Sequence, residues 1–184
     1  MTEHVKLVQL LVARSARRGN FTLASGRQST LYIDARLTTM SPEGLIVIGS
    51  LGLRTIRNKW RADSVGGLTL GADPISYAIS YASGVTDQPL RAFTVRKEAK
   101  SHGTGKLIEG PFQAGDRVVV IEDVITTGGS ALKAVAAVQA AGGIVAGVLA
   151  LVDREEGGRE AIEAAGIAVV SLVTARELLP LIAP

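Results

Sequence analysis

The amino-acid sequence predicts an α/β protein in which helices flank a mainly parallel central sheet. From residue 62 onward, short apolar segments typical of strands alternate with segments of helical periodicity, an order characteristic of βαβ units. Hydrophobic residues make up 47% of the chain but aromatic residues only 4%, so aliphatic side chains must fill the core. The 184 residues suit a single domain spanning 1–184, because no repeat or linker divides them.

The first forty residues are expected to form a helix followed by a short extended segment. Residues 5–18 repeat apolar side chains at helical spacing, which predicts a helix with Arg14, Arg17 and Arg18 on a solvated or interfacial face. FTLASGRQSTLYIDAR, residues 21–36, reads as two extended pieces around a Ser-Gly turn. Ser41-Pro42-Glu43 then predicts the capped start of a second helix.

The remaining elements follow in regular order. Strands are expected at ADSVGGL (62–68), PLRAFTV (89–95), DRVVVIEDV (116–124), GIVAGVLALVD (143–153) and IAVVSLV (167–173). Helices are expected in DPISYAISYA (73–82), SALKAVAAVQAAG (130–142) and the second half of REEGGREAIEAAG (154–166). Ligands of parallel sheets bind beyond the carboxyl ends of the strands, so four loops should converge there: 66–73, 96–105, 122–130 and 153–158.

Composition and charge argue against several classes of protein. The chain has no cysteine, which excludes disulfides, thiolate metal sites and a cysteine nucleophile, and which suits the cytoplasmic location that we expect. The N-terminus lacks the apolar core of a signal peptide, and the most apolar stretch, 143–152, is too short to span a bilayer, so no membrane association is expected. A net charge of +3 suits anionic ligands but gives little reason to expect nucleic acid.

The most informative segment is VVVIEDVITTGGSALKAV, residues 118–135, which joins a strand to a helix. Its Thr-Thr-Gly-Gly-Ser turn, residues 126–130, offers main-chain N–H groups and hydroxyls at a helix N-terminus, which favours a bound phosphate. The preceding carboxylates of Glu122 and Asp123 would repel that phosphate, whereas the two hydroxyls of a ribose would satisfy them. Because adjacent strand residues point to opposite faces, one of the two could instead anchor the loop.

A turn without a ligand and two nucleotide-binding folds account for this segment less well. A capped turn beside a solvated acidic pair would need no ligand, but the strand, acids, loop and helix start all agree with phosphate binding. The sequence contains neither GxGxxG after a strand nor GxxxxGK[ST], so the dinucleotide-binding fold and the P-loop ATPases are poor alternatives.

The segment resembles the 5-phosphoribosyl 1-diphosphate (PRPP) signature of the type I phosphoribosyltransferases. The resemblance implies that family's fold, with a small N-terminal hood formed by about residues 1–40. It also implies that the loop holds the ribose 5′-phosphate and that the acids face the ribose hydroxyls. The implied PRPP-binding residues are Arg96, Lys97, Lys100, His102, Glu122, Asp123, Val124, Ile125, Thr126, Thr127, Gly128, Gly129 and Ser130.

Three further segments resemble the orotate phosphoribosyltransferases within that family. RKEAKSHG, with Arg96, Lys97, Lys100, His102 and Gly103, matches their mobile catalytic loop, which is the most specific match. FTLASGRQSTLYID matches their N-terminal segment. VDREEG matches the strand end whose arginine, Arg154 here, meets the orotate carboxylate, although an Asp-Arg pair taken alone would suggest a surface ion pair.

The resemblance implies transfer of ribosyl 5-phosphate from PRPP to orotate, giving orotidine 5′-monophosphate and pyrophosphate in pyrimidine biosynthesis. The implied catalytic residues are Lys100, His102 and Asp123, and the implied orotate contacts are Thr126 and Arg154. Mg²⁺ would be held mainly through PRPP. A homodimer with shared active sites is implied, because the family's loop reaches into the neighbouring subunit.

Two rival functions remain: a phosphoribosyltransferase for a purine or another base, and a non-catalytic PRPP-sensing regulator that binds nucleic acid. Neither explains RKEAKSHG, and a compact chain of charge +3 has no evident DNA-binding face.

Two positions depart from the enterobacterial-type pattern of the family. Ala24 stands where that pattern has a lysine, and Leu70-Gly71 stands where it has Tyr-Lys. Two phosphate-facing cations are therefore missing, so activity should depend more strongly on Arg96, Lys100 and His102.

Overall fold

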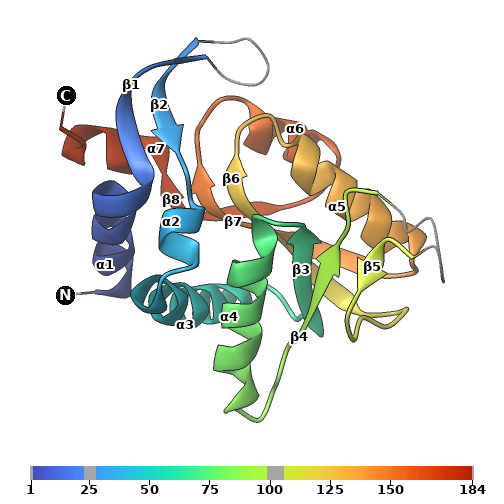
Figure 1. The fold of residues 1–184 in the computed structure, drawn as a ribbon. Coiled ribbons are helices and arrows are strands. Elements are labelled where there is room, and N and C mark those ends of the chain that lie inside the picture. The colour runs from blue at the N-terminus through green and yellow to red at the C-terminus, as the bar shows by residue number, and fades with distance from the viewer. Residues whose placement is uncertain (1, 23–27, 99–105, 184) are drawn as a thin grey trace.

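A six-stranded sheet forms the centre of the computed structural model, which describes residues 2–22, 28–98 and 106–183 (Figure 1). Its strands are β3 Ser64–Leu68, β4 Arg91–Val95, β5 Ile108–Glu109, β6 Arg117–Ile125, β7 Ile144–Asp153 and β8 Val169–Thr174. They lie in the order β5-β4-β3-β6-β7-β8, and all neighbours are parallel except β4 and β5. The predicted mainly parallel α/β fold is confirmed.

Helices cover both faces of this sheet (Figure 1). One face is covered by α3 Pro42–Lys59 and α4 Ala72–Gly84, and the other by α5 Gly129–Ala140 and α6 Gly158–Ala164. After β8 the chain continues into α7 Ala175–Leu178 and the 3₁₀ turn η2 Leu179–Leu181. Successive residues of β6 alternate between the two cores: Val119 and Ile121 pack towards α3, Val118 and Val120 towards α5. Burial on both faces explains the continuous apolar run in this strand.

The N-terminal segment forms a helical stretch and a two-stranded antiparallel sheet, the hood. Its elements are α1 Glu3–Leu10, the π-helical turn η1 Leu11–Ser15, β1 Ala16–Thr22, β2 Gln28–Ile33 and α2 Arg36–Thr39. The predicted helix over 5–18 is wrong beyond residue 15, because Arg17 and Arg18 pair with Tyr32 and Leu31 of β2. Pairing between strands overrides the helical periodicity there. The cap at Ser41 is confirmed, since its side chain accepts a hydrogen bond from Gly44 N at 3.1 Å.

The order of strands sets the position of a ligand site. β3 and β6 are neighbours, but the chain continues from β3 to β4 on one side and from β6 to β7 on the other. Ligands of open α/β sheets bind at such a switch point, beyond the carboxyl ends of the two strands. The loop after β3 and the loop after β6 both begin at this point. Among the described residues, no helix combines the length and the hydrophobicity needed to cross a bilayer.

Candidate active site

The loop after β6 forms a small cradle at the start of α5. A cavity of about 90 Å³ is lined by Glu122 and by residues 124–130. Gly128 precedes α5 with φ 79°, and a Cβ there would lie 2.7 Å from the Gly158 carbonyl oxygen, so the left-handed turn requires glycine. Gly128, the N-cap residue of α5, has no side chain with which to cap the helix, and the first N–H groups of α5 are therefore available to an anion.

A larger cavity of about 320 Å³ adjoins this cradle, because Glu122 and Ser130 line both. Its other walls come from separate parts of the chain. They are residues 32–36 of the hood end, residues 68–71 after β3, Lys97 and Asp123. The cradle and the larger cavity together form one continuous polar site at the switch point.

The two acids of β6 both line the larger cavity. Glu122 is buried, so a solvated acidic pair does not describe it, and its Oε2 has no hydrogen-bond partner in the described part of the chain. Burial, and secondarily the negative charge and hydrogen bond of Asp123, raise the pKa of Glu122 to about 9. Asp123 Oδ1 accepts a hydrogen bond from Val124 N at 2.9 Å.

The loop after β3 forms the opposite wall of the larger cavity. The peptide bond between Thr69 and Leu70 is cis. Thr69 Oγ1 donates to the buried Asp73 carboxylate at 2.6 Å, and Thr69 N donates to Val95 O at 2.8 Å. These bonds hold the loop between α4 and β4, with Gly71 directly against the carboxylate of Asp123 at the cavity wall.

The basic loop after β4 contributes two described residues. Lys97 is exposed and lines the larger cavity, while Arg96 lies beside Glu109, with Nη1 3.7 Å from Oε1. Both also line a neighbouring cavity that includes Thr69. Lys100, His102 and Gly103, like Ala24 in the hood, lie outside the described residues.

Comparison with known proteins identifies the family. No protein-family model matches the chain. A curated relative, the orotate phosphoribosyltransferase of Aquifex aeolicus, is 48% identical over an alignment of 182 residues, which covers 97% of this chain and 99% of the relative. The chain belongs to the orotate phosphoribosyltransferase family. The resemblance inferred from the sequence motifs is thereby confirmed.

Solved structures agree with this membership. An orotate phosphoribosyltransferase of Mycobacterium tuberculosis, solved with Fe(III) dicitrate, superposes with a TM-score of 0.85 at 44% identity, covering 96% of this chain and 99% of the other. The same enzyme solved with PRPP gives a TM-score of 0.82 at 42% identity, covering 96% and 99%. The fold is that of the type I phosphoribosyltransferases.

The orotate residue implied by the family resemblance, Arg154, lies buried beneath the hood. Its Nη2 donates to Ser29 Oγ at 2.6 Å and to Leu31 O at 2.8 Å, and it pairs with Glu156 at 2.8 Å. Its backbone N donates to Ile125 O at 3.0 Å, beside the phosphate cradle. Within the described residues its Nε has no hydrogen-bond partner, so one guanidinium donor remains unsatisfied.

Sequence reasoning missed the contribution of residues 32–36. At the wall of the larger cavity, Arg36 donates from Nε to Asp34 Oδ1 at 2.8 Å and from Nη2 to Asp34 Oδ2 at 3.0 Å. This two-point ion pair lowers the pKa of Asp34. The available signal was an Asp-Ala-Arg sequence directly after an extended segment. That signal is weak, because it resembles an ordinary surface turn.

Proposed function

We propose that this member of the orotate phosphoribosyltransferase family transfers the ribosyl 5-phosphate group of PRPP to orotate, forming orotidine 5′-monophosphate and pyrophosphate. One observation carries the proposal: an uncapped helix N-terminus opens into a cavity lined by two carboxylates. A phosphate monoester joined to a ribose diol matches these two parts in charge and in hydrogen bonding.

The cavities suggest an arrangement for PRPP. The 5′-phosphate would occupy the cradle and bind the N–H groups and hydroxyls of residues 126–130. The ribose hydroxyls would donate to Glu122 and Asp123, where the cradle meets the larger cavity. The pyrophosphate would extend towards Lys97 and the backbone of residues 69–71 on the far wall. This arrangement assigns a role to every wall except the hood end.

Orotate would lie between the ribose and the hood. Arg154 carries an unsatisfied Nε in the described chain, and a carboxylate is the natural acceptor for it. Thr126 is half-buried at the edge of the cradle, and we propose it as the second orotate contact.

In the proposed reaction a bond forms between orotate N1 and ribose C1′ while the bond from C1′ to pyrophosphate breaks. The N1 proton passes to solvent, and the electron pair of the broken bond leaves with pyrophosphate. Positive charge develops on the ribose, which Asp123 would face, and negative charge develops on the leaving group. Arg96, Lys100 and His102 are proposed to stabilise that negative charge, and His102 to donate a proton to it.

Mg²⁺ is expected to accompany PRPP, and the donors of the site suit it. Asp123 offers carboxylate oxygens, and Glu122 would offer them once a bound cation displaces the proton that its raised pKa retains. Mg²⁺ commonly binds one or two carboxylates together with substrate phosphates. Within residues 2–22, 28–98 and 106–183, no group of three or more His, Cys, Asp or Glu residues is placed to hold a metal ion. The ion would therefore depend on PRPP for further ligands. When bound, it would neutralise charge on the pyrophosphate.

A homodimer with shared active sites is the second part of the proposal. Tyr77 and Tyr81 project from successive turns of α4 with 51% and 83% exposure, and Val85 follows at its C-cap with 85%. Such a stripe of large exposed side chains is typical of an interface. α4 begins at the loop that lines the larger cavity, so a partner on this helix would lie close to the site.

The test is a spectrophotometric assay that follows loss of orotate with PRPP and Mg²⁺. Uracil, adenine and hypoxanthine serve as alternative bases, and one arm omits Mg²⁺. We expect turnover of orotate alone and loss of turnover without the metal. Turnover of adenine or hypoxanthine but not orotate would replace the proposed substrate, and binding of PRPP without turnover of any base would favour a regulatory role.

A further inference from the structure

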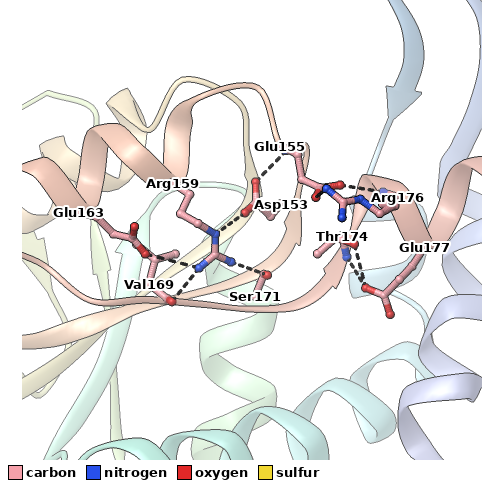
Figure 2. Close-up of polar contacts among 9 residues, drawn as sticks. All are labelled: Asp153, Glu155, Arg159, Glu163, Val169, Ser171, Thr174, Arg176 and Glu177. Atoms are coloured by element: carbon pink, nitrogen blue, oxygen red, sulfur yellow. Dashed lines mark hydrogen bonds and ion pairs between the residues drawn. The ribbon is translucent and has the colours of Figure 1, made fainter.

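The loop that carries Arg154 is held by a buried ion pair behind it. Asp153 ends β7 and is almost fully buried, and its carboxylate accepts two hydrogen bonds at 2.8 Å. One comes from Glu155 N, within the loop, and the other from Arg159 Nε, in the first turns of α6. The Asp153 carboxylate therefore connects Glu155, the residue after Arg154, to Arg159 of α6 (Figure 2).

Arg159 is bonded in turn to the neighbouring strand. Its Nη1 donates to Val169 O at 2.9 Å and its Nη2 donates to Ser171 Oγ at 2.8 Å, both in β8. The exposed Glu163 adds a longer ion pair, with its Oε1 3.6 Å from Arg159 Nη1. Figure 2 shows the guanidinium between α6 and the sheet, with all three nitrogens directed at acceptors. The planar fork of arginine suits such a three-way contact, and lysine cannot reproduce it.

The loop is held from its other side by α7. Glu155 has φ 57°, an unusual conformation for a residue other than glycine. Its carboxylate accepts from Arg176 N at 2.9 Å and pairs with Arg176 Nη2 at 2.9 Å (Figure 2). The residues on both sides of Arg154 are thus fixed, one through Arg159 and one through Arg176.

From these contacts we infer that Arg159 is a positioning residue for the base: through Asp153 it sets the backbone that directs Arg154 towards the orotate carboxylate. The inference rests on the proposed function. Arg159 does not line the cavities that hold the proposed PRPP groups, so it should affect orotate and PRPP differently.

Removing Arg159 has two consequences in this arrangement. Asp153 loses its charged partner, and a buried carboxylate without one is costly. Its remaining bond, to Glu155 N, then no longer connects the loop to α6 and β8. A displacement of Arg154 by a fraction of an ångström would weaken a bidentate carboxylate contact, because such contacts depend strongly on geometry.

The experiment compares Arg159→Met, Arg159→Lys and Arg154→Met with the wild type. Steady-state kinetics give KM for orotate and for PRPP separately, and thermal unfolding reports stability. For Arg159→Met we expect KM for orotate to rise about tenfold, with KM for PRPP within about twofold of wild type. Arg159→Lys should recover part of the loss, because it keeps a charge beside Asp153 but loses the fork.

A matched control exists at the opposite end of the sheet. Arg91 and Asp116 form an ion pair with side-chain exposures of 32% and 6%, against 29% and 2% for Arg159 and Asp153. Arg91→Met should lower the unfolding temperature without changing KM for orotate. If Arg159→Met proves too unstable to purify, Ser171→Ala removes one hydrogen bond of the Arg159 guanidinium. It should give a smaller rise in KM for orotate than the rise expected for Arg159→Met.

The outcomes separate this inference from the proposed function. A wild-type enzyme that does not use orotate rejects the proposed function itself. A wild-type enzyme that uses orotate, together with a folded Arg159→Met whose KM for orotate is unchanged, overturns only the inference. Equal changes in both KM values, or the same change in Arg91→Met, would reduce Arg159 to a general structural role and also overturn it.

Discussion

The α-carbon of Gly71 packs directly against the carboxylate of Asp123 at the wall of the candidate active site. A Cβ built on Gly71 would lie within 2.7 Å of both carboxylate oxygens, far inside van der Waals contact. The enterobacterial-type pattern of the family has a lysine at this position. With Asp123 placed as it is, no side chain fits at Gly71. We therefore expect backbone N–H groups of this loop to contact pyrophosphate in place of that lysine.

The first prediction concerns this contact. Gly71→Ala should force Asp123 away from the ribose position and lower kcat/KM for PRPP by about tenfold or more, because the carboxylate cannot retreat without losing its bond to Val124 N. Gly84→Ala is the control, since a Cβ at that residue meets no atom within 4 Å. Steady-state kinetics at saturating orotate provide the measurement. Equal kcat/KM values for the two variants would contradict the assignment of Asp123 to the ribose.

The second prediction concerns the pH dependence of stability. The pKa of Glu122 is raised to about 9 in the folded state by burial and by Asp123, whereas in the unfolded chain it is near the ordinary 4.5. Between these values the folded protein holds a proton that the unfolded chain has released. Stability should therefore fall as pH rises through this window, by up to about 1.4 kcal/mol per pH unit from this group.

Glu122→Gln removes that titration, and its unfolding temperature should exceed that of the wild type by a margin that grows from about pH 6 to about pH 8.5, pH values chosen inside the window. Differential scanning calorimetry without ligand gives the measurement. Glu160→Gln, at an exposed position of α6, should run parallel to the wild type. A margin independent of pH would show that Glu122 is already ionised in the folded protein.

Much of the site followed from the sequence because its chemistry lies in continuous segments. The strand, the two acids, the glycine turn and the helix start follow one another directly in residues 118–135, so the sequence alone predicts their order. The structure has the same order. The end of the first helix at Ser15 could not be predicted, since it depends on pairing with β2. Nor could the contribution of Arg36, which lines the site only because the hood folds over the sheet. The contact between Gly71 and Asp123 likewise exists only after β3 and β6 become neighbours.

A third prediction concerns Asp73, which supports the loop after β3. Its carboxylate accepts from Thr69 Oγ1 at 2.6 Å and from Thr94 Oγ1 at 2.8 Å. Asp73→Asn replaces one acceptor by a donor and should displace Thr69, raising KM for PRPP about fivefold while KM for orotate changes less. Asp87→Asn, at an exposed position, is the control. The proposal for the pyrophosphate wall fails if Asp73→Asn binds PRPP as tightly as the wild type does.

The fourth prediction concerns the basic loop and the proposed dimer. With lysines absent at Ala24 and Gly71, Lys100 and His102 should carry much of the stabilisation of the leaving group. Lys100→Ala and His102→Ala should each lower kcat by about a hundredfold or more, since each removes a charge or donor that acts at the transition state. Lys6→Ala, on the exposed side of α1, should leave kcat unchanged. Near-normal turnover in both loop variants would mean that the loop does not act on pyrophosphate.

The same variants test whether the sites are shared between subunits. Lys100→Ala and Asp123→Asn should each be inactive alone, but a mixed dimer would contain one site with both wild-type residues if the loop crosses to the partner. Mixing equal amounts should then restore about a quarter of the wild-type activity per subunit, because half of the dimers are mixed and each has one intact site. Tyr81→Asp, which places a charge on the exposed stripe of α4, should give monomers in sedimentation velocity and abolish the recovery. Mixed dimers verified by differently tagged subunits but showing no recovery would place each loop in its own subunit's site.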